Sequence, residues 1–324
     1  KAPRMTGSWA INPAEAIGVA DRIGDVRLLA RAASAMTIGA LWQSAPHGVV
    51  HGDVVAALRR SLAELPTEDD ALRCRATLSL ANELYYGSTF EERSALVDEA
   101  LAMARRLDDD QLLMECCQVG FVSLWRPDTA ERRVALITEA MDLAVEHSQE
   151  RAFTVAATLA SVGYAELGRT REMWETAAVA RDYADRLRLP YGLMVLCSNE
   201  IPWLSMAGRF EEAEARLDDL VRLAEQMELH QKDEALAGAV ISLRLWQGRS
   251  AEVVPMLQAV QDGPLPATTL IAAYMVRAGQ VDETRAYLRD HVADLAPENW
   301  FSLLNWSCAA EVAAGIGDAE LGAR

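Results

Sequence analysis

The residue types that bind metals occur in this sequence without the spacing that a metal site needs. His47 and His51 are four residues apart beside a turn, with Asp53 as the nearest acid, which makes them a candidate metal pair. An irregular segment of this kind is more typical of an exposed helix start, so we expect no metal there. His147 and His230 fall near expected helix C-termini, where an imidazolium is favourable.

Clustered carboxylates are the second candidate for chemistry. The acidic runs 68–70 and 108–110 lie at expected loop-to-helix junctions, whereas paired catalytic carboxylates must converge in a buried site. We expect Asp70 and Asp110 to act as helix N-caps instead. The sequence also has no glycine-rich phosphate loop, dinucleotide fingerprint, zinc-binding spacing or Gly-x-Ser-x-Gly elbow. We therefore expect this segment to be no enzyme and to hold no metal or cofactor.

Aromatic residues point to binding rather than to catalysis. The chain has eight tryptophans, several of them near the ends of expected helices. Two interpretations stay open, packing between stacked helices or an aromatic-lined groove for a peptide, sugar or metabolite. The segment around Pro202 is the best candidate for a polar pocket, because proline within a helix kinks it and frees a carbonyl group. The candidate binding residues are Asn199, Glu200, Trp203, Tyr164, Trp125 and Trp246.

The charge of the chain excludes one class of partner. Its net charge is −17, and we find no basic stripe of the kind that binds a nucleic-acid backbone. The short basic runs 59–60, 105–106 and 132–133 lie among acids, so we expect them on solvated helix faces with i,i+4 pairing. We therefore expect no direct nucleic-acid contact by this segment.

Cysteine usage and the chain ends indicate the compartment. The five cysteines are an odd number without a Cys-x-x-Cys pair, which suits buried thiols in a reducing cytoplasm. No apolar run reaches the roughly 18 residues of a membrane span. The N-terminus has neither an initiator Met nor a signal peptide, and the C-terminus reads like the start of another helical unit. We expect a cytoplasmic fragment of a longer chain.

The spacing of turns reveals a repeat. Ala, Leu, Glu and Arg dominate the composition, which favours helix. A Gly-Arg turn follows an apolar helix at Gly168, Gly208 and Gly248, with 40 residues between successive turns. Stepping back by the same interval reaches turns of breaker or capping residues, at Asp128, Ser88 and Gly48. The sequence therefore predicts helical pairs with a period of about 40 residues.

The helices after these turns share one pattern. Segments 91–104, 130–144 and 211–224 repeat apolar residues at three and four positions and begin with acids. The period degenerates after Gly248, since the next unit is only 31 residues long. One pair cannot bury its own apolar stripe, so neighbouring pairs must stack. We predict an all-α solenoid of about eight antiparallel pairs, a right-handed superhelix that forms one domain over 1–324.

The pairs resemble tetratricopeptide repeats, although units of about forty residues exceed that family's usual length of about 34. Gly163 and Tyr164 fit the family pattern, as does the turn 167–169, whereas most units lack a proline equivalent to Pro190. Nearly the whole chain is similar to the C-terminal helical region of large actinobacterial regulators. The stretches that carry this second resemblance are 81–86, 99–108, 124–128, 207–214 and 299–300.

The second resemblance implies a sensor and interaction arm. In that family an ATPase module lies upstream and a LuxR-type helix-turn-helix often lies at the end, so both of those sites would fall outside this chain. We expect a domain that binds a small-molecule effector, or a protein partner including itself, and gates an ATP-dependent transcriptional switch. The alternative is a free-standing scaffold that holds a partner peptide in its concave groove, where the acidic charge would favour a basic partner.

Overall fold

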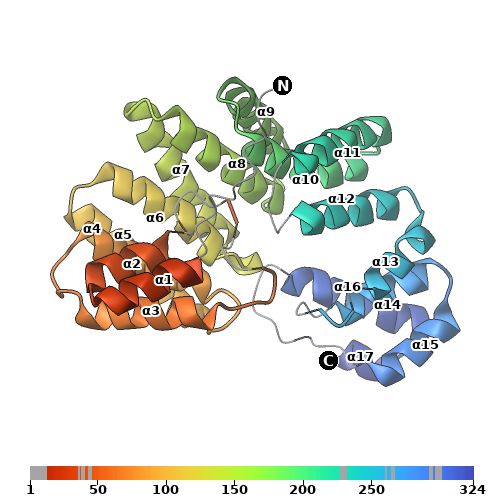
Figure 1. The fold of residues 1–324 in the computed structure, drawn as a ribbon. Coiled ribbons are helices and arrows are strands. Elements are labelled where there is room, and N and C mark those ends of the chain that lie inside the picture. Colours follow the sequence, from red (N-terminus) through yellow and green to blue (C-terminus); the bar gives the residue numbers. More distant parts are fainter. Residues whose placement is uncertain are drawn as a thin grey trace, which may run out of the picture. The chain divides into compact units, whose positions relative to one another are not determined.

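The computed structural model describes residues 13–35, 37, 41–42, 46–226, 232–259, 261–263, 267–291, 295 and 301–324. Every regular element in these ranges is a helix, which confirms the all-α prediction. Consecutive helices pack as pairs (Figure 1). No helix in the described part of the chain is long and apolar enough to cross a membrane. His230 and the stretch 299–300 singled out above lie outside the described residues.

The chain divides into two compact units. The first comprises the described residues up to 45 together with Val49–Leu124, and the second comprises Pro46–Gly48 and the described residues from Trp125 onward. The helices of the first unit are α1 (Pro13–Ile23), α2 (Val26–Ser34), α3 (Gly52–Glu64), α4 (Ala71–Glu83), α5 (Phe90–Arg106) and α6 (Asp110–Ser123).

The second unit contains the remaining α-helices and two short 3₁₀ helices. The 3₁₀ helices span Pro127–Thr129 and Ser250–Glu252. Its α-helices are α7 (Ala130–Glu146), α8 (Glu150–Glu166), α9 (Thr170–Arg186), α10 (Pro190–Met206), α11 (Phe210–Glu225), α12 (Lys232–Trp246), α13 (Val254–Gln258), α14 (Thr268–Arg277), α15 (Val281–Asp290), α16 (Ser302–Ile316) and α17 (Ala319–Ala323).

The two helices of a pair bury different amounts of their surface. The first helices α4 and α6 are buried over nearly their whole C-terminal two thirds. The second helix α9 buries only a stripe, made of Met173, Ala177, Ala180 and Ala184. This spacing of three and four residues is the single apolar face that the sequence pattern predicts. These first helices are therefore buried more completely than the second helix α9.

The turns at three Gly-Arg positions are left-handed, as their glycines predict. Gly168, Gly208 and Gly248 have φ of 68°, 71° and 72°, a region that is cheap only for glycine. A second left-handed series was not apparent from the sequence because its members are not glycine. These residues end the second helices at the same 40-residue interval, and they are Asp108, Ser148 and Arg188.

The backbone conformations of two glycines predict that replacement by alanine changes the stability of the chain in opposite directions. We expect Gly168→Ala to lower the free energy of unfolding by about 1 kcal/mol, because alanine is strained at positive φ. Gly238→Ala should raise it by up to about 1 kcal/mol, since Gly238 lies inside α12 with open space where a Cβ would stand. Urea unfolding followed by circular dichroism measures both. Effects of the same sign would contradict the assigned backbone conformations.

Two acidic helix starts give one confirmation and one correction. Asp70 caps α4 as predicted, since its Oδ1 accepts from the backbone N–H groups of Leu72 at 2.7 Å and Arg73 at 3.3 Å. The prediction for Asp110 is wrong. Asp109 caps α6 by accepting from Leu112 N at 2.9 Å, and Asp110 is already helical. In a run of three aspartates the sequence does not specify which residue takes the extended conformation of a cap.

All five cysteines are buried and carry free thiols. Cys74 Sγ and Cys116 Sγ are 3.5 Å apart in the first unit. The hydrogen bond with Cys74 and burial raise the pKa of the Cys116 thiol, and burial raises the pKa of Cys308 to about 11. Since the thiolate is the reactive form, these thiols are inert in the folded chain.

This burial predicts the reactivity of the thiols. At pH 8 we expect an aromatic disulfide reagent to label essentially no thiol of the folded chain within minutes. In denaturant, where burial is lost, all five should react. Absorbance of the released thiolate gives the count. Rapid labelling of the native chain would show that the cores open around these residues.

Candidate functional site

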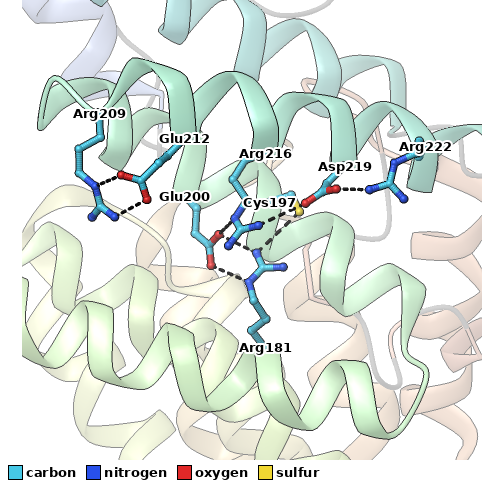
Figure 2. A network of polar contacts seen from close by, with 8 residues as sticks. All are labelled: Arg181, Cys197, Glu200, Arg209, Glu212, Arg216, Asp219 and Arg222. Carbon is cyan, nitrogen blue, oxygen red and sulfur yellow. Dashed lines mark hydrogen bonds and ion pairs between the residues drawn. The ribbon is translucent and has the colours of Figure 1, made fainter.

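A buried carboxylate lies at the meeting point of three helices in the second unit. Glu200 of α10 is only 5% exposed. It accepts two hydrogen bonds from Arg181 of α9, Nε to Oε1 at 3.1 Å and Nη2 to Oε2 at 2.6 Å. Arg216 of α11 donates from Nε to Oε2 at 2.8 Å. Figure 2 shows both guanidinium groups turned toward this carboxylate. We call these three residues the Glu200 network.

Two further charged residues extend this network along α11, and a separate ion pair lies near the start of that helix. Arg216 also donates through Nη1 to Asp219 Oδ2 at 3.2 Å, and Asp219 in turn accepts from Arg222. At the opposite end, Arg209 holds Glu212 by two bonds of 2.6 and 2.5 Å (Figure 2). Glu212, Arg216 and Asp219 lie along one face of α11, and Arg209 is the N-cap residue directly before it.

The electrostatic environment fixes the charge of the buried arginine. Burial alone would lower the pKa of Arg181, but the hydrogen bonds and negative charge of Glu200 more than offset it, so the pKa of Arg181 is raised. Arg181 also donates to Cys197 Sγ at 3.7 Å. A buried charge is tolerated only when it is paired in this way. Glu200 and Arg181 therefore form a buried structural ion pair.

A cleft opens beside the Glu200 network. It has a volume of about 320 Å³, and its lining includes all three network residues together with Trp174, Leu204 and Arg209. Trp174 meets Trp203 edge to face, with ring centroids 5.8 Å apart and planes at 86°. The guanidinium of Arg209 lies 5.6 Å from the Trp174 ring centroid. The cleft thus combines an aromatic surface with fixed charges, which is the composition of a binding site.

The structure brings part of the predicted site together. Glu200 lines the cleft, and Trp203 supports its wall through Trp174. Asn199 does not line it, although its buried Nδ2 has no hydrogen-bond partner among the described residues. Tyr164 of α8 is half-buried and lies outside the cleft lining.

Two predicted aromatics also lie outside this cleft. Trp125 is buried under the guanidinium of Arg133, 5.2 Å from its ring centroid. Trp246 is 47% exposed at the end of α12. These placements assign Trp125 to packing and leave Trp246 on the surface.

Sequence reasoning missed most of the cleft residues. Trp174 and Arg181 are seven residues apart on α9. Arg209, the N-cap residue of α11, and Arg216 within that helix are also seven apart. A seven-residue interval returns to the same helix face after two turns. This interval was the available sequence signal for the cleft. It occurs in two neighbouring helical segments, and each carries an arginine and a second polar or aromatic residue at that spacing.

The prediction of solvated basic faces is wrong for Arg133. This side chain is fully buried. Its Nε donates to Thr129 Oγ1 at 3.0 Å, and its Nη2 donates to Glu166 Oε2 at 2.5 Å. The stacking on Trp125 accounts for its burial, because an arginine can bury its planar group against an aromatic face while keeping its hydrogen bonds.

Arg93 repeats this arrangement 40 residues earlier, in the first unit. It is buried, its guanidinium lies 5.0 Å from the Tyr85 ring centroid, and it donates to Ser123 O at 3.3 Å and Ser88 O at 3.0 Å. The matching positions in the next repeats are Met173 and Ala213, both buried. The position is thus a core position that arginine occupies twice, so these two residues belong to the architecture of the repeat.

The two candidate metal histidines have separate carboxylate neighbours. His51 Nδ1 lies 3.2 Å from Glu83 Oε2 in the first unit, and His47 Nδ1 lies 3.3 Å from Glu234 Oε2 in the second. Burial lowers the pKa of His47, although Glu234 opposes this. In the described part of the chain, no group of three or more His, Cys, Asp or Glu residues is arranged to hold a metal ion.

Neither a protein-family model nor a curated protein matches this chain.

Proposed function

We propose that this chain is a non-catalytic sensor and interaction domain of a multidomain, ATP-dependent transcriptional regulator, and that the cleft beside Glu200 is its effector site. The cleft carries this proposal. Its volume of about 320 Å³ suits a small molecule. It also combines the indole of Trp174 with the buried ion pair of Glu200 and Arg181. The free thiols of the five cysteines support a cytoplasmic location.

The position of the cleft explains how an effector would be sensed. Its lining residues come from α9 of one pair and from α10 and α11 of the next. A ligand that binds all three helices favours one packing of these pairs over another. In our proposal about eight tetratricopeptide-like pairs continue this stacking as one right-handed solenoid over 1–324. That packing change then reaches the upstream ATPase module through the array.

Native mass spectrometry of the purified chain tests the effector site. We expect a small-molecule adduct that survives gentle ionisation, and we expect Trp174→Leu to lose it. A matched control is Trp246→Leu, because Trp246 is also a tryptophan, is 47% exposed and lies outside the cleft lining. An adduct that persists in Trp174→Leu, or a chain that never carries one, would count against the proposed site.

The full-length protein tests the regulatory role. We expect its rate of ATP hydrolysis to change when the adduct molecule is added. The Trp174→Leu variant should keep its basal rate and lose this response. An unchanged rate on addition of the molecule would separate the cleft from regulation.

A second candidate function is a scaffold for a partner protein. Met206 and Trp246 end successive first helices at the 40-residue interval, and they are 62% and 47% exposed. Large apolar side chains at equivalent surface positions are typical of partner contacts. Binding of a fluorescent Arg- and Leu-rich peptide would probe the surface that contains Met206 and Trp246. Scaffold binding should weaken with salt and in the Met206→Ser, Trp246→Ser double variant, and insensitivity to both would exclude this surface.

A further inference from the structure

We propose that the cleft between α9, α10 and α11 binds a small aromatic carboxylate, with Arg209 and Arg216 as its anion-binding residues and Trp174 as its apolar contact. This inference rests on the proposed effector site and names the chemical class of its ligand.

The balance of charge favours an anion. The charged residues labelled in Figure 2 are Arg181, Arg209, Arg216 and Arg222 together with Glu200, Glu212 and Asp219. Arginine is thus in excess here, although the whole chain carries a net charge of −17. The lining itself includes three arginines and two glutamates. Local positive charge in an acidic protein concentrates anions at that point and disfavours cations.

Several N–H groups remain available to a ligand. Glu200 already accepts three hydrogen bonds from Arg181 and Arg216. Among the described residues, no protein acceptor is bound to Arg209 Nη1 or to Arg216 Nη2. Guanidinium forks match the geometry of a carboxylate and bind it through charge-assisted hydrogen bonds. The cleft therefore offers donors for an anion and few acceptors for a cation.

One of the ion pairs is suited to exchange with a ligand. The side chains of Arg209 and Glu212 are 49% and 57% exposed, whereas those of Arg181 and Glu200 are 18% and 7% exposed. Exposed ion pairs contribute little to stability, so a ligand carboxylate can replace Glu212 on Arg209 without loss of the fold. Arg181 and Glu200 stay in place and hold Arg216 in position.

The aromatic surface determines the rest of the ligand. Because Arg209 already lies 5.6 Å from the Trp174 ring centroid, a carboxylate bound to Arg209 carries its attached group close to the indole. Leu204, Ala178 and Ala215 complete the apolar lining. If the group attached to the carboxylate is a flat aromatic ring, it gains contact area and favourable stacking geometry against the Trp174 indole. An aromatic acid fits this arrangement, and a free inorganic anion leaves Trp174 unused.

Three near-isosteric probes test the charge preference directly. Benzoate, benzamide and benzamidine share one ring and differ in charge. Ligand-observed NMR titration should give saturable binding for benzoate, binding weaker by about tenfold for benzamide, and none for benzamidine. Arg209→Gln should weaken benzoate binding by about tenfold. The matched control Arg249→Gln, which removes the equivalent pair one repeat later, should leave it unchanged.

Each contrary outcome has a distinct meaning. No binding of benzoate overturns the anion assignment, and so does benzoate binding that Arg209→Gln leaves unchanged. If benzamidine binds as well as benzoate and Trp174→Leu abolishes both, the anion assignment fails while the effector site stands. If benzoate shows no binding and the native mass spectrum shows no adduct, both the ligand class and the effector site fail.

Discussion

Arg133→Ala is expected to lower the free energy of unfolding by about 3 kcal/mol. The substitution removes a fully buried guanidinium, its bonds to Glu166 and Thr129, and its stacking on Trp125. Loss of one partner of a buried ion pair costs about 3–5 kcal/mol when the other charge stays buried. We expect the lower end because the Glu166 side chain is 27% exposed and gains some hydration. Urea unfolding of the chain measures the change.

Two further variants separate charge from packing at this position. Arg132→Ala removes the neighbouring arginine, which is only partly buried, and should change stability by less than about 1 kcal/mol. Arg133→Met keeps much of the buried volume and should recover part of the loss, since apolar replacements of buried ion pairs are often tolerated. A loss in Arg132→Ala as large as that in Arg133→Ala would contradict the assigned burial.

Glu200→Ala is expected to have the second large effect, a loss of about 3 kcal/mol or more. It leaves Arg181 and Arg216 facing each other without the carboxylate that both bind. The Arg181 side chain is only 18% exposed, so water replaces the lost partner poorly. Thermal unfolding monitored by circular dichroism would show a lower Tm. Glu200 thus supports the cleft structurally, and its replacement tests the fold before it tests ligand binding.

A matched control for Glu200→Ala lies on the same cleft. Glu212 also pairs with an arginine, but both side chains are exposed, so Glu212→Ala should leave the Tm nearly unchanged. Glu200→Gln should fall between the two variants, because the amide keeps one acceptor and loses the charge. Equal Tm values for Glu200→Ala and Glu212→Ala would show that Glu200 is hydrated in solution.

Much of the fold was predictable from the sequence because its signals are local. The apolar stripe of α9 follows from residues three and four apart, and the left-handed turn at Gly168 follows from one glycine. The cap at Asp70 likewise depends on a side chain and backbone groups two and three residues away. Local interactions of this kind are encoded in neighbouring residues and need no knowledge of the tertiary packing.

The site was less predictable because its contacts join different helices. Pro202 drew attention to α10 and thereby to Glu200, but the partners Arg181 and Arg216 are 19 and 16 residues away. The burial of Arg133 depends in the same way on Glu166, 33 residues later. Whether an arginine faces water or a buried carboxylate depends on how successive pairs pack, and helical periodicity alone does not specify that.

The Glu200 network has a consequence for local unfolding. In a repeat array each pair is coupled mainly to its nearest neighbours, so end pairs and interior pairs can open separately. Glu200 joins α9 of one pair to α11 of the next through a single buried carboxylate. When α11 separates from its neighbours by local unfolding, Glu200 loses Arg216 as a hydrogen-bond partner. The interaction of Glu200 with Arg181 of α9 is then weaker as well. Helices α9, α10 and α11 should therefore exchange their amide hydrogens as one cooperative unit, across a boundary where a repeat would otherwise separate.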